Sequence, residues 1–489
     1  MDIIERINGV INDFVWGPVM IAILLGTGIL LTVRTKFLQV SKFPTCLKNT
    51  VGATIQDVKQ GKKSKTGVSS FQAFSAAIAG TVGTGNIVGV STALVAGGPG
   101  AIFWMWVSAF FGMMTKFSEN VLGIYYRKQG DDGIMRGGPM YYIRYGLNWK
   151  WLAVLFSIFC VFASFGYNMT QVNSISSTLN TTIGLPLWVT GLIVVVFAAL
   201  VLLGGIRRIG RVASYVVPFM ALLFILMALT IIGINIQAVP QSFAMIFSNA
   251  FRWESVGGGI MGYTIMRAMR FGLARGIFSN EAGLGSSVMA HSASDVKEPV
   301  KQGMWGVFEV FVDTIVICTL MSLVLLSTGV YESSGLDGAP LALAAFSKDL
   351  GTFGKIAFSV ILPLFAFTTV LSWSFYGEKA TEYLFGKKAV IPYKLIILGV
   401  IFLGAVIKLE LVWSISDTFN GLMAIPNLIS LILMSGTVAK ITKNYFERKK
   451  GKATEAMLSA YAEENERLKE EIRQEEAGEP APTESATQA

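Results

Sequence analysis

Two clusters of glycine and small polar residues interrupt long apolar stretches of this chain. The first is residues 80–89 (GTVGTGNIVG) and the second is residues 278–287 (FSNEAGLGSS). In lipid every peptide N–H and C=O needs a hydrogen-bond partner, so an unwound stretch persists only where it lines a cavity or meets a ligand. Paired interruptions in the two halves of a chain indicate a binding site near the bilayer midplane.

The helix dipole decides what such interruptions can bind. Free N–H groups at the start of a second half-helix favour an anion such as a carboxylate. Free carbonyls at the end of the first half-helix favour a hard cation or an ammonium group. Two interrupted helices together are therefore suited to a small zwitterion, and an amino acid is the simplest one.

The first cluster also has a structural explanation. Gly85 and Gly89 have the small-xxx-small spacing that lets two helices pack closely. Close packing does not account for Thr81, Thr84 and Asn86, because polar side chains deep in a span cost free energy unless they have partners or a function. The cluster misses the dinucleotide-binding glycine spacing by one position, and no P-loop lysine follows it, so a nucleotide site is excluded.

The second cluster contains a carboxylate, Glu281. An ionisable residue within a membrane helix indicates a functional site by default. The alternative is a structural ion pair or helix cap, with partners available among the arginines that precede it, Arg267, Arg270 and Arg275. The sequence favours neither explanation.

Two other apolar stretches carry polar side chains that could complete a site. Gln171 lies in the first, and Thr368, Thr369 and Ser372 lie in the second. Hydroxyl and carbonyl oxygens suit sodium, which is a hard cation. Thr368 and Ser372 are four residues apart and are predicted to share one helix face. The alternative for these hydroxyls is bonding to carbonyls of their own helix.

Four further charged residues lie in predicted spans. Lys116 is close in sequence to Glu119, and Glu309 is close to Asp313. A proton relay is one interpretation. Structural pairing is favoured, with partners expected among Arg127, Lys301 and the three arginines before the second cluster.

The composition is that of a membrane protein. Of 489 residues, 53% are hydrophobic and 15% are charged, and the mean hydropathy is +0.58. A soluble protein of this size carries about a quarter charged residues. Apolar stretches that approach the roughly 20 residues needed to cross a bilayer predict about eleven spans. They are 15–33, 68–96, 100–126, 150–178, 186–204, 212–235, 258–292 (interrupted), 300–328, 353–382, 393–408 and 411–437.

The distribution of Lys and Arg orients these spans, because basic loops stay on the cytoplasmic side. Most basic residues lie in the loops 34–66, 127–150, 207–211, 293–302 and 379–394 and in the stretch after 437. The opposite side has Arg6, Arg252, Lys348, Lys355 and Lys408. We expect a multi-pass protein of the cytoplasmic membrane, with its N-terminus outside and its C-terminus in the cytoplasm. The net charge of +9 then faces the anionic inner leaflet and does not indicate a nucleic-acid partner.

Other kinds of site have little material in this chain. Cys46, Cys160 and Cys318 are scattered and are interpreted as packing residues. His291 is the single histidine, which leaves almost nothing for a histidine-based metal site. No span contains a nucleophile–base pair, a zinc-type cluster or a phosphate loop, so we do not expect an enzyme.

The tail beyond Arg448 has a different character. Leu458, Tyr461, Asn465, Leu468 and Ile472 recur at spacings of three and four among charged residues. This pattern predicts a solvated cytoplasmic helix or, alternatively, a weak self-association element. The chain after Gly478 is predicted to be disordered.

Four motifs, found in this order, resemble one known family. Residues 80–89, 97–106 (GGPGAIFWMW), 137–142 (GGPMYY) and 278–283 (FSNEAG) resemble the alanine or glycine:cation symporter family, over about residues 15–443. The resemblance implies an all-α LeuT-type fold, with one extra N-terminal helix before two five-helix repeats of inverted topology and with two discontinuous helices.

The expected divisions of the chain follow from this resemblance and the spans. They are an external amphipathic segment (1–14), the extra helix (15–33), a basic cytoplasmic loop (34–66), the first repeat (67–235), an external loop (236–255), the second repeat (256–437) and the cytoplasmic tail (438–489).

The resemblance also implies the residues of a site. The amino-acid pocket would be formed by Thr81, Thr84, Gly85, Asn86, Gln171, Phe278, Ser279, Asn280 and Trp373. For Phe278 and Trp373, packing alone is the alternative. A sodium site would be formed by the backbone of Gly80 and Gly83 with Thr368 and Thr369, and Ser372 could replace either threonine.

The residues and the resemblance agree on a sodium-coupled symporter. It would import alanine, glycine or a similar small neutral amino acid by alternating access, with the amino acid, the sodium ion and the bilayer as its partners. The nearest alternative is a proton-coupled transporter in which Glu281 or Glu119 controls the pH dependence. A channel and a membrane enzyme are less favoured.

Overall fold

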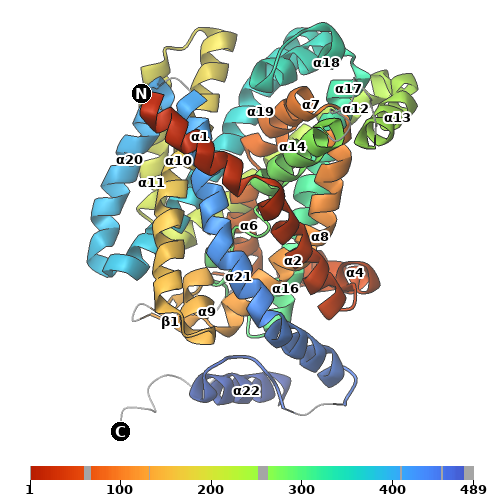
Figure 1. Ribbon diagram of the computed structural model, residues 1–489. Coiled ribbons are helices and arrows are strands. Elements are labelled where there is room, and N and C mark those ends of the chain that lie inside the picture. Colours follow the sequence, from red (N-terminus) through yellow and green to blue (C-terminus); the bar gives the residue numbers. More distant parts are fainter. Residues whose placement is uncertain are drawn as a thin grey trace.

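The computed structural model describes residues 2–59, 68–130, 133–251, 263–407, 410–452 and 455–477, and most of them are helical (Figure 1). The helices up to the middle of the chain are α1 (Asp2–Val15), α2 (Pro18–Arg34), α3 (Leu38–Ser41), α4 (Phe43–Leu47), α5 (Ala53–Lys59), α6 (Ser70–Thr81), α7 (Val90–Gly97), α8 (Gly100–Tyr125), α9 (Pro139–Gly146), α10 (Lys150–Ile183), α11 (Leu187–Leu202), α12 (Gly205–Ile234) and α13 (Val239–Ala250).

The later helices are α14 (Tyr263–Asn280), α15 (Val288–His291), α16 (Pro299–Val310), α17 (Thr319–Ser327), α18 (Val330–Ser333), α19 (Gly338–Phe385), α20 (Val390–Val406), α21 (Glu410–Arg448) and α22 (Ala462–Ala477). Short π-helical or 3-10 segments are η1 (Lys48–Gly52), η2 (Gly85–Gly89), η3 (Ile236–Ala238), η4 (Phe311–Cys318) and η5 (Lys387–Ala389). A small antiparallel ribbon pairs β1 (Lys128–Gln129) with β2 (Met135–Arg136).

Helices that can cross a membrane make up most of the fold. Within the described residues, 7 helices are long and apolar enough, and the bent pair of α6 and α7 brings the number to 8. The 7 are residues 6–34, α10, α12, the 299–327 helix, α19, the 387–406 helix and residues 413–448. Together with α8, α11 and α14 these helices account for the predicted spans. The protein is an all-helical polytopic membrane protein, as predicted.

Close helix crossings hold the bundle together. α10 packs along α19, α20 and α21, and α8 packs along α14 and α16. Gly404 of α20 lies against the backbone of Met169 in α10, where an added Cβ would be 2.6 Å from the Met169 Cα. Gly166 of α10 packs against Ser416 of α21 in the same way, and a Cβ added to Gly166 would be 2.7 Å from the Ser416 Cβ. Small residues let membrane helices approach because lipid offers no hydrophobic driving force between them.

The N-terminal segment does not stand apart from the bundle. α1 packs on α21, where Asn8 Nδ2 donates to Ser414 Oγ at 2.6 Å and Trp16 Nε1 donates to the Asp417 carbonyl at 3.0 Å. Its placement outside the membrane, the sidedness of both termini and the division into two repeats stay predictions.

Two predicted loops contain helices. The stretch 236–255 was predicted as an external loop, but η3 and α13 occupy most of it. The prediction missed that Ser242, Ile246 and Ala250 recur at every fourth position and are buried, with α13 packed on α8 and α17. The basic loop 34–66 holds α3, α4, η1 and α5. Residues 60–67, 252–262 and 478–489, and with them the ends of both loops and the predicted disordered end, lie outside the described residues.

The crossing at Gly404 gives a first prediction. Gly404→Ala places a methyl group against the Met169 backbone, which cannot move aside as a side chain can, so we expect a loss of about 1–3 kcal/mol in stability. The measurement is the thermal melting of the purified protein in detergent. Gly399→Ala on the same helix is the matched control, because no atom lies within 4 Å of its added Cβ. Equal melting temperatures for the two variants would contradict this account of the crossing.

Candidate functional site

The first glycine cluster bends a helix in two. α6 ends at Thr81, Val82 leaves helical geometry with φ −77° and ψ 89°, and the helix resumes through η2 into α7. The two halves meet at 45°. Glycines favour this bend because glycine has a low helix propensity. The Thr81 hydroxyl donates to the Ile78 carbonyl at 3.3 Å, so it bonds to its own helix.

Side-chain amide oxygens accept hydrogen bonds from the N–H groups that this bend leaves without a partner in the helix. Asn86 Oδ1 accepts from the Gly83 N–H at 2.9 Å, and Gln171 Oε1 on α10 accepts from the Thr84 N–H at 3.2 Å. The Thr84 hydroxyl oxygen is buried without a hydrogen-bond partner among the described residues. An unpaired buried hydroxyl is uncommon in folded proteins. This one lies immediately before η2, where the helix resumes after the bend.

The second cluster ends α14 in an unwound segment. Glu281, Gly283 and Gly285 have φ values of 56°, 97° and 74°. Glycine adopts this left-handed region without strain, whereas Glu281 is one of few other residues here that does so. Asn280 Oδ1 accepts from the Ala282 N–H at 3.0 Å and closes the first turn of the segment.

Buried side chains from three other helices hold this unwound segment. Glu119 Oε1 on α8 accepts from the Gly283 N–H at 3.0 Å. Asn427 Nδ2 on α21 donates to the Gly283 carbonyl at 2.9 Å and to Glu119 at 2.6 Å. Trp373 Nε1 on α19 donates to Glu281 Oε1 at 2.7 Å. Both free groups of Gly283 are therefore satisfied by polar side chains of neighbouring helices.

Two of the arginines considered as possible partners of Glu281 pair with other carboxylates. Arg270 pairs with Asp13 at 2.7 Å, and Arg275 pairs with Asp417 at 3.1 Å. The prediction assumed helical spacing, but Glu281 lies beyond the end of α14 in a left-handed conformation. Its carboxylate is therefore not on the helix face that carries the arginines.

The charged pairs of α8 and α16 also have other partners than predicted. Lys116 Nζ lies 3.4 Å from Glu309 Oε1 and donates to Ser287 Oγ at 2.8 Å. Arg127 instead donates to backbone carbonyls. The packing of α8 on α16 places Lys116 opposite Glu309, and sequence spacing does not contain that contact. The favoured interpretation, structural pairing, agrees with this geometry.

The two interruptions meet at Asp313 of η4. Asn86 Nδ2 from the first interruption donates to Asp313 Oδ1 at 2.7 Å, and Ser279 Oγ from the second donates to Asp313 Oδ2 at 2.9 Å. An added Cβ on Gly85 would lie 3.2 Å from the Ser279 Cα, so the two backbones are nearly in contact. Asn280 donates to Thr314, the next residue, at 3.1 Å.

The sequence analysis did not assign Asp313 to the site. A signal was present: the residues three and four positions away from Asp313 are Glu309, Val310, Val316 and Ile317, and none is basic. A carboxylate in an apolar helix without a basic neighbour on its own face must find its partners on other helices.

Hydroxyl groups of α19 face the end of α6. Thr369 Oγ1 donates to the Ala79 carbonyl at 3.1 Å, and Ser372 Oγ donates to the Ala76 carbonyl at 2.7 Å. The Thr368 hydroxyl instead bonds to the Leu364 carbonyl of its own helix at 3.1 Å, which is the alternative that the sequence left open for these hydroxyls. The contacts with α6 are made by Thr369 and Ser372.

These oxygen atoms have the chemistry that sodium prefers, since carbonyl and hydroxyl oxygens are hard, neutral donors. The carbonyls beside the hydroxyls are those of Ala76 and Ala79. Gly80 and Gly83, which were predicted to supply backbone oxygens, lie against α19 through their Cα atoms, with Thr369 Oγ1 beside Gly83. No group of three or more His, Cys, Asp or Glu side chains that could hold a metal ion occurs in the part of the chain that the structure describes.

An aromatic stack closes one side of the interruptions. The ring of Tyr167 on α10 stacks on Trp373 at 3.7 Å between centroids and on Phe278 at 4.6 Å. The Tyr167 hydroxyl donates to the Phe278 carbonyl at 3.0 Å. Tyr167 was not predicted, but it lies one helical turn before Gln171 on the same face. The structure thus brings Phe278 and Trp373 together through a third aromatic residue.

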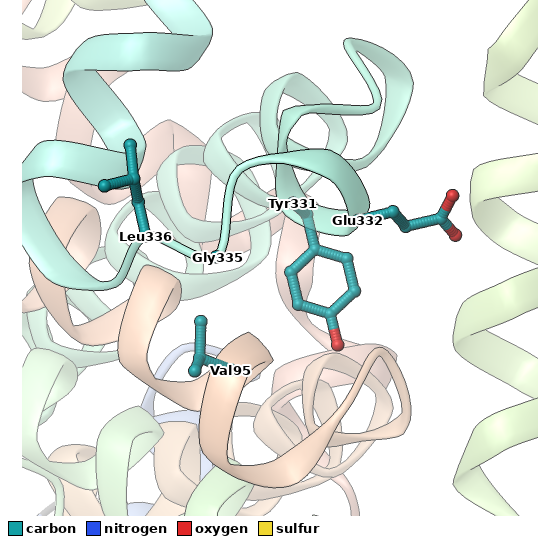
Figure 2. A pocket seen from close by; sticks show the side chains of 5 residues that line it. All are labelled: Val95, Tyr331, Glu332, Gly335 and Leu336. Carbon is teal, nitrogen blue, oxygen red and sulfur yellow. The ribbon is translucent and has the colours of Figure 1, made fainter.

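A surface cavity lies away from these residues. It has a volume of about 420 Å³ and lies between the end of α7 and α18, lined by Val95, Tyr331, Glu332, Gly335 and Leu336 (Figure 2). The Tyr331 hydroxyl donates to the Leu94 carbonyl at 3.2 Å, and Figure 2 shows the Glu332 side chain extending away from Val95. The predicted site residues are buried between helices and do not line this cavity.

Comparison with known proteins adds to this geometry. A sodium/alanine symporter of Methanococcus maripaludis, AgcS, is 45% identical to this chain over 464 residues, which cover 93% of this chain and 100% of that protein. An uncharacterized transporter of Haemophilus influenzae is 45% identical over 450 residues, covering 91% of this chain and 97% of that protein.

A solved structure shares the fold. The crystal structure of MhsT in complex with L-phenylalanine has a TM-score of 0.55 and 14% sequence identity, covering 76% of this chain and 97% of that chain. At this identity the similarity concerns the fold alone, and it confirms the predicted LeuT-type arrangement.

The sequence profile of the sodium:alanine symporter family matches residues 1–459 of this chain. That range contains both interruptions, Asp313 and the hydroxyls of α19. With nearly the whole chain matched, and with relatives at 45% identity over almost their full length, this chain belongs to the sodium:alanine symporter family.

Proposed function

We propose that the chain imports a small neutral amino acid, such as alanine or glycine, together with sodium. The observation that carries this proposal is the meeting of two interrupted helices, in which Asn86 and Ser279 reach the same carboxylate. The start of α7 and the end of α6 present opposite partial charges there, which suits the two ends of a zwitterion. The name of the 45% identical relative, a sodium/alanine symporter, agrees with it.

The amino-acid carboxylate would bind at the start of the second half of the first interrupted helix. The Gly83 and Thr84 N–H groups are now held by the neutral amides of Asn86 and Gln171. A carboxylate is a stronger acceptor than an amide oxygen, so it would replace them. The buried Thr84 hydroxyl would then gain a partner.

The aromatic stack would limit the size of the transported side chain. Tyr167, Phe278 and Trp373 form one continuous wall, and Trp373 is tied to Glu281. One methyl group changes binding by only about 1–3 kcal/mol, so alanine and glycine would both fit such a wall.

Sodium would bind between α6 and α19 and complete the site. Thr369 and Ser372 place hydroxyl oxygens against the Ala79 and Ala76 carbonyls of α6, and Ala79 belongs to its last turn. With both ligands bound near the midplane, the helices that carry the interruptions would move against α10 and α19 and release them inward. No covalent chemistry is required.

Uptake in liposomes tests the coupling. Purified protein should concentrate labelled alanine above equilibrium only when sodium is higher outside than inside, because the ion completes the site. The control replaces sodium by potassium at equal ionic strength. Uptake that is unaffected by removal of sodium would defeat the proposal, and flux that only equalises the two sides would indicate a channel.

The hydroxyls of α19 give a second test. Thr369→Ala and Ser372→Ala should each raise the sodium concentration for half-maximal uptake roughly tenfold, because a lost oxygen ligand costs about 1–1.5 kcal/mol. Thr368→Ala is the matched control, since the Thr368 hydroxyl bonds to carbonyls of α19, whereas those of Thr369 and Ser372 also bond to carbonyls of α6, and its sodium dependence should stay unchanged. If all three variants responded alike, this assignment of the sodium ligands would be wrong.

Proton coupling remains the second candidate, and Asp313 favours it beyond the two residues first considered. Its carboxylate touches both interruptions and accepts hydrogen bonds from the neutral groups of Asn86, Ser279 and Thr314. A relative from Bacillus subtilis carries the name sodium/proton-dependent alanine carrier. In a proton-coupled mechanism, protonation of the Asp313 carboxylate would take the role that sodium binding has in the sodium-coupled one.

Three near-isosteric variants separate the candidates. With sodium coupling, Glu119→Gln, Glu281→Gln and Asp313→Asn should leave the pH profile of uptake parallel to that of the parent, whatever their maximal rates. With proton coupling, one of them would abolish the pH dependence. The accompanying measurement is uptake driven by a pH gradient in sodium-free liposomes, which we expect to be absent.

A further inference from the structure

The chain beyond α21 folds back onto the end of the bundle at which α21 finishes. Figure 1 shows α22 at the foot of the helices, near α9 and α16. Leu458 and Leu468, two residues of the predicted self-association seam, are 1% and 5% exposed because they pack within this chain. The region matched to the family ends at residue 459, so α22 (Ala462–Ala477) lies beyond the matched region.

One set of contacts joins the tail to the end of α8. The Ala460 N–H donates to the Tyr125 carbonyl at 2.9 Å, and the Tyr461 hydroxyl donates to the Tyr126 carbonyl at 3.2 Å. Lys128 Nζ lies 4.8 Å from the centre of the Tyr461 ring. Burial raises the pKa of Tyr461 well above its usual value, so its hydroxyl remains a donor.

A second set joins the tail to the segment that follows the second interruption. Lys297 Nζ pairs with Glu471 of α22 at 2.9 Å. Glu298 accepts two hydrogen bonds of 2.8 Å from Arg448, at the end of α21. These residues connect α15 to α16, so the tail is attached directly below an interrupted helix.

The same segment ties the inner ends of both interrupted helices together. The Asp295 N–H donates to the Val68 carbonyl, just before α6, at 3.0 Å. Arg127 donates to the carbonyls of Ser292 and Ser294 at 3.2 and 2.6 Å. Burial lowers the pKa of Arg127 to about 10, while the nearby Glu464 of α22 acts in the opposite direction. The tail helix therefore places charged side chains of both signs, Glu464 and Arg467, near the residue that holds this junction.

We propose that residues 455–477 form a cytoplasmic clasp that holds the inner ends of the two interrupted helices together and slows their opening to the cytoplasm. The proposal rests on the alternating access proposed above. The Lys297–Glu471 pair is partly exposed, with side chains 18% and 33% accessible. Such pairs are individually weak, so the clasp can release and rebind during transport. The clasp is a contact within one chain, and it takes the place of the self-association that the sequence left open as an alternative.

Full-length variants test the clasp with two independent measurements. Glu471→Lys should raise the initial rate of alanine uptake about two- to five-fold, in keeping with one partly exposed pair. It should also speed hydrogen–deuterium exchange of residues 292–298. The double variant Lys297→Glu with Glu471→Lys should restore both values toward the parent.

Glu470→Lys is the matched control on the same helix. Glu470 is 60% exposed, and it contacts two residues of its own helix, Arg473 at 3.7 Å and Gln474 Nε2 at 3.3 Å, so neither measurement should change. Leu468→Glu removes a buried anchor of the tail and should act as Glu471→Lys does, without altering the sodium dependence. Two different positions thus report the same contact.

Each possible outcome either supports or contradicts the proposed clasp. Unchanged exchange at residues 292–298 in both Glu471→Lys and Leu468→Glu would show that the tail holds nothing there. Faster exchange with an unchanged uptake rate would overturn the restraint on transport. If the parent showed no sodium-driven uptake, the proposed function would fail, while the exchange measurement would still decide whether the tail secures this junction.

Discussion

The structure depends on one constraint: main-chain groups that leave a helix inside a membrane must find partners in a medium without water. An unpaired amide in such surroundings costs several kcal/mol. At the second interruption Glu119 and Asn427 take up both groups of Gly283. At the first, Asn86 and Gln171 accept the freed N–H groups. The polar residues of the bundle gather where the backbone is exposed.

This requirement also explains which helices surround the interruptions. A side chain on the same helix can satisfy only a nearby group, as Asn280 does for Ala282. The remaining groups draw on α8, α10, α19 and α21, each of which supplies a buried polar residue. Glycines at the crossings let these helices come close enough for hydrogen bonds of normal length. The packing and the site are therefore consequences of the same contacts.

The sequence predicted those features that depend on local properties. Glycine content located both interruptions, and hydropathy located the helices that carry them. The partners of the polar residues depend on crossings between helices that are distant in sequence, and these were predicted less well. Arg270 and Arg275, considered as partners of Glu281, pair elsewhere, and the Thr368 hydroxyl bonds to its own helix. Asp313 was considered for pairing but was not assigned to the site, because its partners, Asn86 and Ser279, lie 227 and 34 residues away. α13 was taken for a loop because short helices lack the length that identifies a span.

Asp313 has a mechanical consequence. Asn86 and Ser279, which belong to different broken helices, both donate to its carboxylate and both reach its Oδ1, so a displacement at one helix is transmitted to the other through this single group. No relay of side chains across the bundle is needed for this coupling. Because Asn86 and Ser279 bond to the same carboxylate, a displacement of either one alters the electrostatic surroundings of both at once.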